Sequence, residues 1–106
     1  MKQKPIKLNA HLLEFLNGLD SKERISYISK APQSLIKFIA DLFHNILSGN
    51  FELSSEILIK LKPHRKLIEA VCKKGIPLSK RRKNIKKKNF FTDIIRPIIP
   101  DLFQKL

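Results

Sequence analysis

The sequence contains little cysteine, glycine or tryptophan, and each shortage excludes a class of protein or site. One cysteine among 106 residues allows no disulfide within the chain and no multi-cysteine metal site, which indicates a reducing compartment. Three glycines leave little room for a phosphate-binding loop, and tryptophan is absent. No apolar run approaches the roughly 18 residues of a membrane span, and no long apolar stretch indicates a secretory signal.

Acidic residues are also scarce, and the basic excess lies in one part of the chain. The 22 Lys and Arg against 9 Asp and Glu leave a net charge of +13. Residues 60–88 hold thirteen of these cations and a single acid, Glu69, for a net charge of +12. A charge this concentrated attracts polyanions and raises the rate at which they associate with the protein.

The length and hydrophobic pattern predict one small all-α domain. A chain of 106 residues allows a single domain, and its hydrophobic content of 42% is close to that of globular proteins. Alternating apolar and polar runs are absent, so we expect no strands. We predict a small bundle of four or five short helices, divided into a flexible N-terminus (1–7), a helical domain (8–78), a basic arm (79–89) and an apolar C-terminal segment (90–106).

Helical spacing is clearest in residues 32–48, where one broad face is apolar and the other polar. This segment is therefore the predicted core helix, with Gly49 as its left-handed C-terminal cap. Asp20 and Glu23 form a capping-box pattern at the start of the preceding helix. Shorter helices are expected over 10–19, 54–61 and 64–74, whereas residues 80–88 fit either a basic helix or a disordered arm.

The C-terminal segment allows two interpretations. Its Ile, Leu and Phe residues follow a spacing near four, which fits an element that docks on the helical core. A membrane-active amphipathic segment is the alternative, although a net charge of zero and two prolines, Pro97 and Pro100, argue against it.

No residue pattern indicates catalysis, a cofactor or a small-molecule substrate. His11, His44 and His64 are too far apart in sequence to suggest a metal site. Cys72 falls on the apolar side of its helix, as expected of a small buried residue rather than a nucleophile. No nucleophile elbow, paired carboxylates or HExxH motif occurs, so a non-enzymatic protein is expected.

The basic segment supplies the candidate nucleic-acid-binding residues. Ten of its thirteen cations are Lys, which favours contact with the phosphate backbone of duplex DNA over reading of base sequence. The run from Lys80 to Lys83 also fits a nuclear-localisation signal, and a solvated basic face is the third hypothesis. These four side chains lack apolar groups that a core needs, so we expect the fold to tolerate their replacement. The thirteen candidates are Lys60, Lys62, Arg65, Lys66, Lys73, Lys74, Lys80, Arg81, Arg82, Lys83, Lys86, Lys87 and Lys88.

Several short motifs resemble one protein family in order and spacing. They are Leu35-Ile36-Lys37, Asn45-Ile46-Leu47-Ser48-Gly49-Asn50, Leu53-Ser54, residues 60–66 (Lys-Leu-Lys-Pro-His-Arg-Lys) and residues 77–83 (Pro-Leu-Ser-Lys-Arg-Arg-Lys). Together they resemble the small basic proteins of polinton-type and adintovirus-like elements of invertebrate genomes, over about residues 10–88. Those proteins are similar in size and charge to the minor DNA-associated core proteins of adenoviruses. The family continues with a glycine-rich hydrophobic tail, whereas here residues 87–92 contain no glycine.

The resemblance and the charge together predict a sequence-independent DNA-binding or packaging protein. We expect a minor virion core component of a virus or virus-like mobile element, located inside the cell in the nucleus, in the virion, or in both. One alternative is a structural interaction protein that binds a capsid protein or another helical partner. A membrane-perturbing entry factor is the other alternative.

Overall fold

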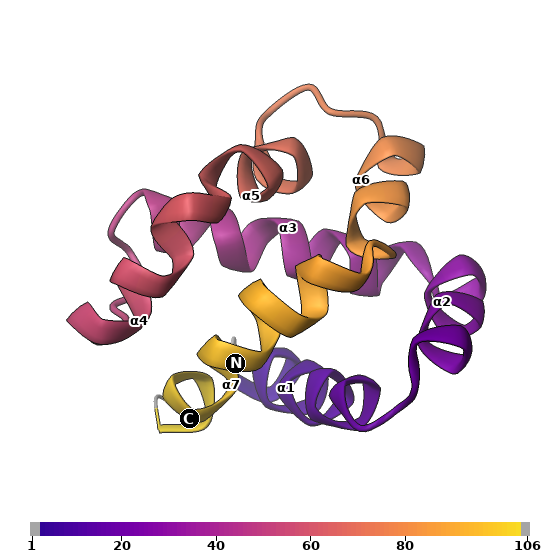
Figure 1. Ribbon diagram of the computed structural model, residues 1–106, viewed down its shortest axis with the longest axis horizontal. Helices are drawn as coiled ribbons and strands as arrows, with labels where there is room; N and C mark the ends of the chain where they lie inside the picture. The colour runs from indigo at the N-terminus through magenta and orange to yellow at the C-terminus, as the bar shows by residue number, and fades with distance from the viewer. Residues whose placement is uncertain (1–2, 105–106) are drawn as a thin grey trace.

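Short connections divide the described chain into six continuous helical segments and no strand (Figure 1). The computed structural model describes the backbone of residues 3–104 and the side chains of residues 10–104. Two segments change their helical geometry part of the way along. The elements are α1 (Gln3–Asn17), α2 (Ser21–Lys30), α3 (Gln33–Leu47), α4 (Ser55–Leu61) continuing through the 3₁₀ turn η1 (Lys62–His64) into α5 (Arg65–Cys72), α6 (Leu78–Ile85), and the π-helical turn η2 (Phe90–Ile95) continuing into α7 (Arg96–Gln104).

Local sequence signals set several of these boundaries as predicted. The Asp20 carboxylate accepts a hydrogen bond from the Glu23 backbone N–H at 2.8 Å, and the Glu23 carboxylate accepts one from the Asp20 N–H at 3.4 Å. Gly49 follows α3 with a φ of 81°, and Gly75 follows α5 with a φ of 89°, a region that favours glycine. Pro63 lies in the 3₁₀ turn between α4 and α5, consistent with the interruption that proline imposes.

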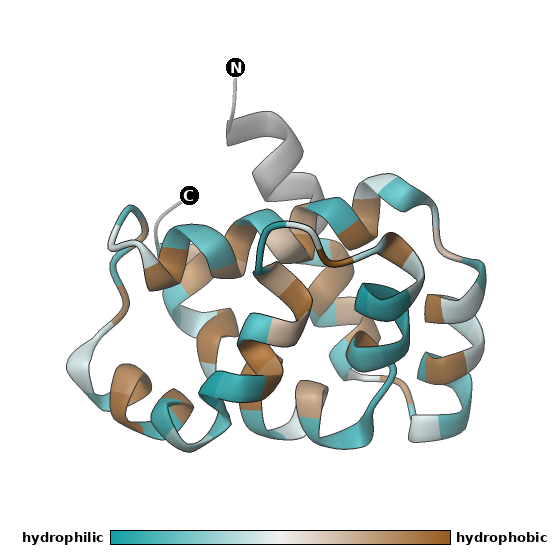
Figure 2. Ribbon diagram, turned by 90° about the horizontal axis from the view of Figure 1, so that it is seen from above, coloured by the Kyte–Doolittle hydropathy of each residue, from teal (hydrophilic) through white to brown (hydrophobic). Residues whose placement is uncertain are grey.

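Helix α3 is the core helix that the hydrophobic pattern predicted. Figure 2 shows hydrophobic and hydrophilic residues alternating along the helices, as helices with one buried side require. Phe43 is completely buried, and its ring meets that of Phe90 edge to face, with 5.6 Å between the ring centroids. The buried residues of α3 are Leu35, Ile36, Ile39, Ala40, Leu42, Phe43 and Ile46.

The apolar C-terminal segment is part of this core. Residues of η2 and α7 cross the middle of the molecule in Figure 1, and α7 packs against α1. Their fully buried side chains agree with the docking interpretation of this segment. These side chains are Phe90, Phe91, Ile94, Ile95, Ile98 and Leu102.

The expected division of the chain therefore needs correction. One hydrophobic core extends from Ala10 through Ile85 of α6 to Leu102, so residues 79–89 and 90–104 are not appendages of a separate 8–78 domain. The Cα radius of gyration of 12.7 Å matches the about 13 Å expected for one compact unit of this length. Six helical segments replace the predicted four or five, because the basic segment and the C-terminal segment each fold as helices.

Two boundary predictions also differ from the structure. Residues 3–7, expected to be flexible, form the beginning of α1, and residues 1–2 lie outside the described residues. The basic helix considered for residues 80–88 begins earlier, at Leu78, and Pro77 precedes it. Proline fits this position because its fixed φ, here −62°, suits the residue that leads into a helix.

Candidate nucleic-acid interface

Arginine side chains bind the C-terminal ends of helices, and the most buried of them is Arg24. Its side chain is 6% exposed, and it donates hydrogen bonds to the carbonyls of Leu16 at 3.0 Å and Leu19 at 2.7 Å, at the end of α1. The guanidinium lies 4.9 Å from the centre of the Phe91 ring. Burial, with repulsion from Arg96, lowers the pKa of Arg24, and attraction to Asp20 partly opposes this. Arg24 is therefore a structural cation.

Two of the predicted binding residues, both on α6, also donate hydrogen bonds to backbone carbonyls at the ends of helices. The Nη1 of Arg82 donates to the carbonyls of Ile28 at 2.8 Å and Ala31 at 2.7 Å, where α2 ends. The Nη2 of Arg81 donates to the carbonyl of Lys73, directly after α5, at 3.1 Å. These carbonyls belong to helix ends, where backbone acceptors lack partners within the helix. The expectation that the fold tolerates replacement of residues 80–83 therefore does not fit Arg81 and Arg82, whose side chains hold backbone carbonyls.

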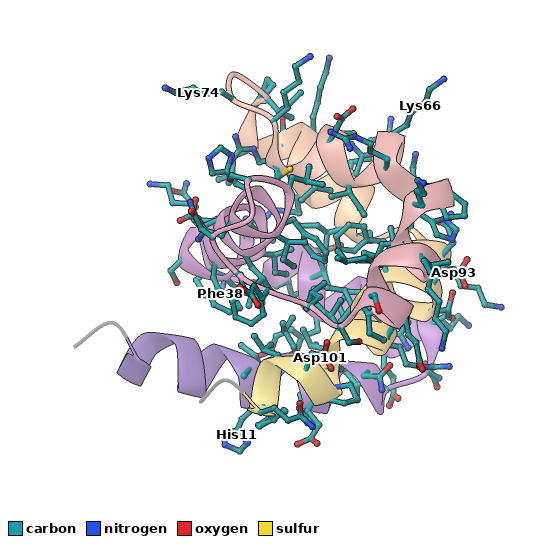
Figure 3. All side chains as sticks on the ribbon, turned by 90° about the vertical axis from the view of Figure 1, so that its left-hand side faces the viewer. His11, Phe38, Lys66, Lys74, Asp93 and Asp101 are labelled. Atoms are coloured by element: carbon teal, nitrogen blue, oxygen red, sulfur yellow. The ribbon has the colours of Figure 1, made fainter. Side chains whose placement is uncertain are left out.

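The lysines around α5 and α6 remain at the surface. Helices α5 and α6 pack against each other, and on α6 the exposed side chains of Lys80 and Lys83 share a face because they are three residues apart. Lys66 and Lys74 both extend from the upper part of the molecule in Figure 3. We call the exposed lysines of α5, α6 and the turns that follow them the lysine surface: Lys66, Lys73, Lys74, Lys80, Lys83, Lys87 and Lys88.

No carboxylate neutralises the lysine surface. Within residues 10–104, the structure contains one ion pair, between the Nε of Arg65 and the Oε2 of Glu69 at 3.1 Å. Both partners are largely exposed and lie one helical turn apart on α5, so the pair contributes little stability. The exposed lysine ammonium groups are therefore accessible to an anionic partner.

The other six predicted binding residues have different surroundings in the fold. Lys60 lines a shallow depression with His64 and Asp93, and Lys62 lines another with Arg65, both beside α4 and η1. Lys86 donates from its ammonium to the Oγ of Ser29 on α2 at 3.2 Å. The thirteen candidates thus separate into the seven residues of the lysine surface, three residues near α4 and three residues that contact the backbone or a side chain of the fold.

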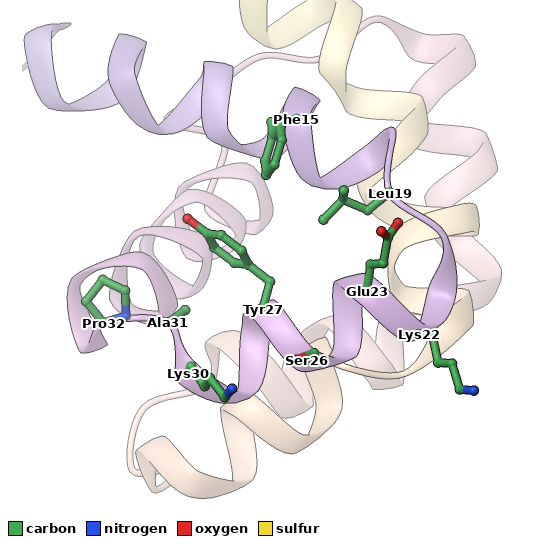
Figure 4. A pocket seen from close by; sticks show the side chains of 9 residues that line it. All are labelled: Phe15, Leu19, Lys22, Glu23, Ser26, Tyr27, Lys30, Ala31 and Pro32. Carbon is green, nitrogen blue, oxygen red and sulfur yellow. The ribbon is translucent and has the colours of Figure 1, made fainter.

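A groove between α1 and α2 was not predicted from the sequence (Figure 4). Phe15 of α1 and Tyr27 of α2 line it, with Lys22 and Lys30 among the other lining residues. Phe15 is 54% exposed, although burial is the usual position of an aromatic ring in a helix that packs on a core. Its exposure depends on the separation of α1 and α2, which has no local sequence signal.

The remaining candidate groups are the histidines and the cysteine. In the described part of the chain, no group of three His, Cys, Asp or Glu side chains is placed to hold a metal ion. The His11 ring packs edge to face on Phe103, with 5.0 Å between centroids. Cys72 is buried, and burial raises the pKa of its thiol, which keeps it protonated and weakly nucleophilic. None of the described helices combines the length and apolarity needed to cross a bilayer.

The structure thus defines a six-segment all-α protein with an unneutralised lysine surface. Comparison with known proteins adds no relative: no family model, no curated protein and no solved structure matches this chain.

Proposed function

We propose that this protein binds nucleic acid, with duplex DNA as the first substrate, through the phosphate backbone and without regard to base sequence. The observation that carries the proposal is the lysine surface, seven exposed cations with no carboxylate partner among residues 10–104. Duplex DNA carries one negative charge per roughly 1.7 Å, and cations that neutralise phosphates release condensed counterions. This release favours binding whatever the base sequence.

The kind of cation supports sequence-independent binding. Lys is a flexible point charge suited to phosphate, whereas base reading commonly uses the planar guanidinium of Arg. Two of the three arginines in the basic segment, Arg81 and Arg82, already donate to backbone carbonyls of the fold. The groups best suited to bidentate base contacts are thus engaged elsewhere.

The biological setting that we propose is packaging of DNA as a minor virion core component of a virus-like mobile element. The resemblance to the small basic proteins of polinton-type elements supports this setting. We further propose the nucleus and the virion as its locations. Nuclear import through residues 80–83 is a secondary role, because only Lys80 and Lys83 of that run are exposed, whereas Arg81 and Arg82 are half-buried.

A DNA-binding titration across a salt series tests the proposal. With about seven phosphates neutralised, we expect the slope of log affinity against log salt to be roughly −6. The triple variant Lys74→Gln, Lys80→Gln, Lys83→Gln should reduce the magnitude of that slope by about 3. The triple variant Lys22→Gln, Lys30→Gln, Lys37→Gln removes the same charge from exposed positions that are not among the thirteen candidates, and it should change the slope for duplex DNA far less. Absence of binding at low salt, or equal effects of the two variants, would contradict the proposal.

A second candidate function, binding of a helical protein partner, has its own observation. The side chains of Leu58 and Ile59 on α4 are exposed, Ile59 to 69%. Leu47 of α3 is also exposed, and it lines the same surface depression as Leu58. The C-terminal apolar side chains, by contrast, are in the core and offer no such surface within residues 90–104. Pull-down of a purified capsid protein, lost in the variant Leu58→Ser, Ile59→Ser, is the corresponding test.

A further inference from the structure

The groove between α1 and α2 is apolar, open to solvent and about 830 Å³ in volume. Figure 4 shows Phe15 from one helix and Tyr27 from the other directed toward the space between them. Leu19, Ala31 and Pro32 complete its apolar lining. The groove is therefore lined by apolar and aromatic groups that a planar ring could contact.

Two aromatic rings remain at the surface here. Phe15 is 54% exposed and Tyr27 is 38% exposed, whereas Phe43, Phe90 and Phe91 are fully buried. The Phe15 and Tyr27 rings meet edge to face, with 6.0 Å between centroids and an angle of 66° between planes. Since this arrangement leaves parts of the ring faces uncovered, each ring can stack on a further flat group.

The charges at the groove favour an anionic ligand. Lys22 and Lys30 are both exposed and line it. Glu23 also lines the groove, but its carboxylate accepts the Asp20 N–H of the capping box and so caps the start of α2. A ligand with both a flat ring and a negative charge would satisfy the aromatic side chains and the lysines together.

Contacts with α6 connect this groove to the lysine surface. Ala31, a lining residue, accepts a hydrogen bond from Arg82, and Ser29 of α2 accepts one from Lys86. Both donors are on or directly after α6, which also carries Lys80 and Lys83. The groove and the basic helix α6 are therefore joined through the end of α2.

We propose that the groove holds an unpaired base of single-stranded nucleic acid, stacked on Tyr27 and Phe15, with the flanking phosphates near Lys22 and Lys30. This inference rests on the proposed nucleic-acid function and extends it to unpaired segments. Stacking on aromatic side chains tolerates any base, in agreement with sequence-independent binding. Duplex DNA, whose bases are already stacked on one another, should not enter the groove.

The fluorescence of Tyr27 tests the proposal directly. The chain has one Tyr and no Trp, so tyrosine emission reports on this groove alone. A twelve-residue oligothymidylate should quench the emission, whereas an abasic oligonucleotide of the same length and a duplex should not. Equal quenching by the oligothymidylate and the abasic strand would show phosphate binding only and overturn the proposal.

Substitutions provide the second arm of the test. Tyr27→Leu and Phe15→Leu keep an apolar side chain but remove the ring, so affinity for the oligothymidylate should fall roughly 5- to 150-fold, the range of one lost stacking contact. Affinity for duplex DNA should stay unchanged, and Tyr27→Phe should retain most single-strand affinity. Ile59→Ala, at an exposed apolar position on α4, is the matched control and should leave both affinities unchanged.

The outcomes separate this inference from the proposed function. If Tyr27→Leu leaves oligothymidylate affinity unchanged while the lysine variant still weakens duplex binding, the groove proposal fails and the proposed function stands. If the wild-type protein binds neither nucleic acid at low salt, the proposed function fails and the groove proposal fails with it. Quenching by an acidic amphipathic peptide but not by the oligothymidylate would assign the groove to a protein partner and overturn the proposal.

Discussion

Arg82 on α6 donates a hydrogen bond to the backbone carbonyl of Ala31, 51 residues earlier in the chain, at 2.7 Å. The same nitrogen reaches the carbonyl of Ile28, so one guanidinium binds two acceptors at the end of α2. A residue that sequence analysis assigned to DNA therefore joins the basic helix to the N-terminal half of the fold.

Replacing Arg82 by Ala should lower the free energy of unfolding by about 2 kcal/mol, because two carbonyls lose a charged hydrogen-bond donor. Urea denaturation followed by circular dichroism measures the change. Lys83→Ala, at the exposed neighbouring position, is the control and should stay within about 0.5 kcal/mol of the wild type. Equal effects of the two substitutions would contradict the structural role of Arg82.

Phe43→Ala should destabilise the protein by about 3–5 kcal/mol, the typical cost of emptying a buried Phe site. Phe43 is completely buried and packs against Phe90, so the cavity would open in the middle of the core. Thermal melting of the variant checks this, with Phe15→Ala as the same chemical change at an exposed position. A native melt for Phe43→Ala would mean that α3 presents an outer surface instead.

Removing residues 89–106 should abolish cooperative unfolding, because the fully buried side chains of η2 and α7 leave with the segment. The single substitution Ile94→Ala should produce a smaller loss of about 2–5 kcal/mol. Circular dichroism and a thermal melt compare the two variants with the full chain. If the shortened chain melts as the full chain does, the segment is not part of the core. Its apolar side chains would then be available to a membrane, as the alternative hypothesis requires.

Cys72 should react slowly with a thiol reagent in the folded protein and rapidly in denaturant. Burial both shields the sulfur and raises the pKa of the thiol, which disfavours the reactive thiolate. Because burial raises the pKa of the thiol in the folded state, the unfolded state loses its proton first as pH rises. The free energy of unfolding therefore falls as pH rises above the ordinary pKa of a thiol. In this alkaline range the free energy of unfolding should therefore fall less steeply with pH in Cys72→Ala than in the wild type.

The parts of the fold that follow local rules were predictable from the sequence. The apolar face of α3, the capping box at Asp20 and the glycine after α3 each depend on residues within one or two helical turns. The role of the C-terminal segment was left open, since spacing near four fits a buried helix and an interfacial helix equally well. Only its packing on α1 and α3 decides between them.

The candidate site was predictable in charge but not in geometry. The concentration of lysine indicated the surface around α5 and α6, yet the charge count could not show that Arg81 and Arg82 turn toward backbone carbonyls. The inward position of Ile85 was likewise hidden, because one isoleucine among so many cations looks like an isolated apolar residue. Phe15 and Tyr27 were missed because their exposure is set by the separation of α1 and α2.

The unneutralised lysines also give the protein two opposite responses to salt. The net charge of +13 makes the cations of the folded protein repel one another, and unfolding relieves that repulsion by letting the chain expand. Added salt screens the repulsion over about 10 Å at 0.1 M, so the free protein should melt at a higher temperature as salt rises. The complex with DNA should instead dissociate over the same range. The polyanion and the salt thus act as alternative sources of counter-charge, and the protein is least stable when it has neither.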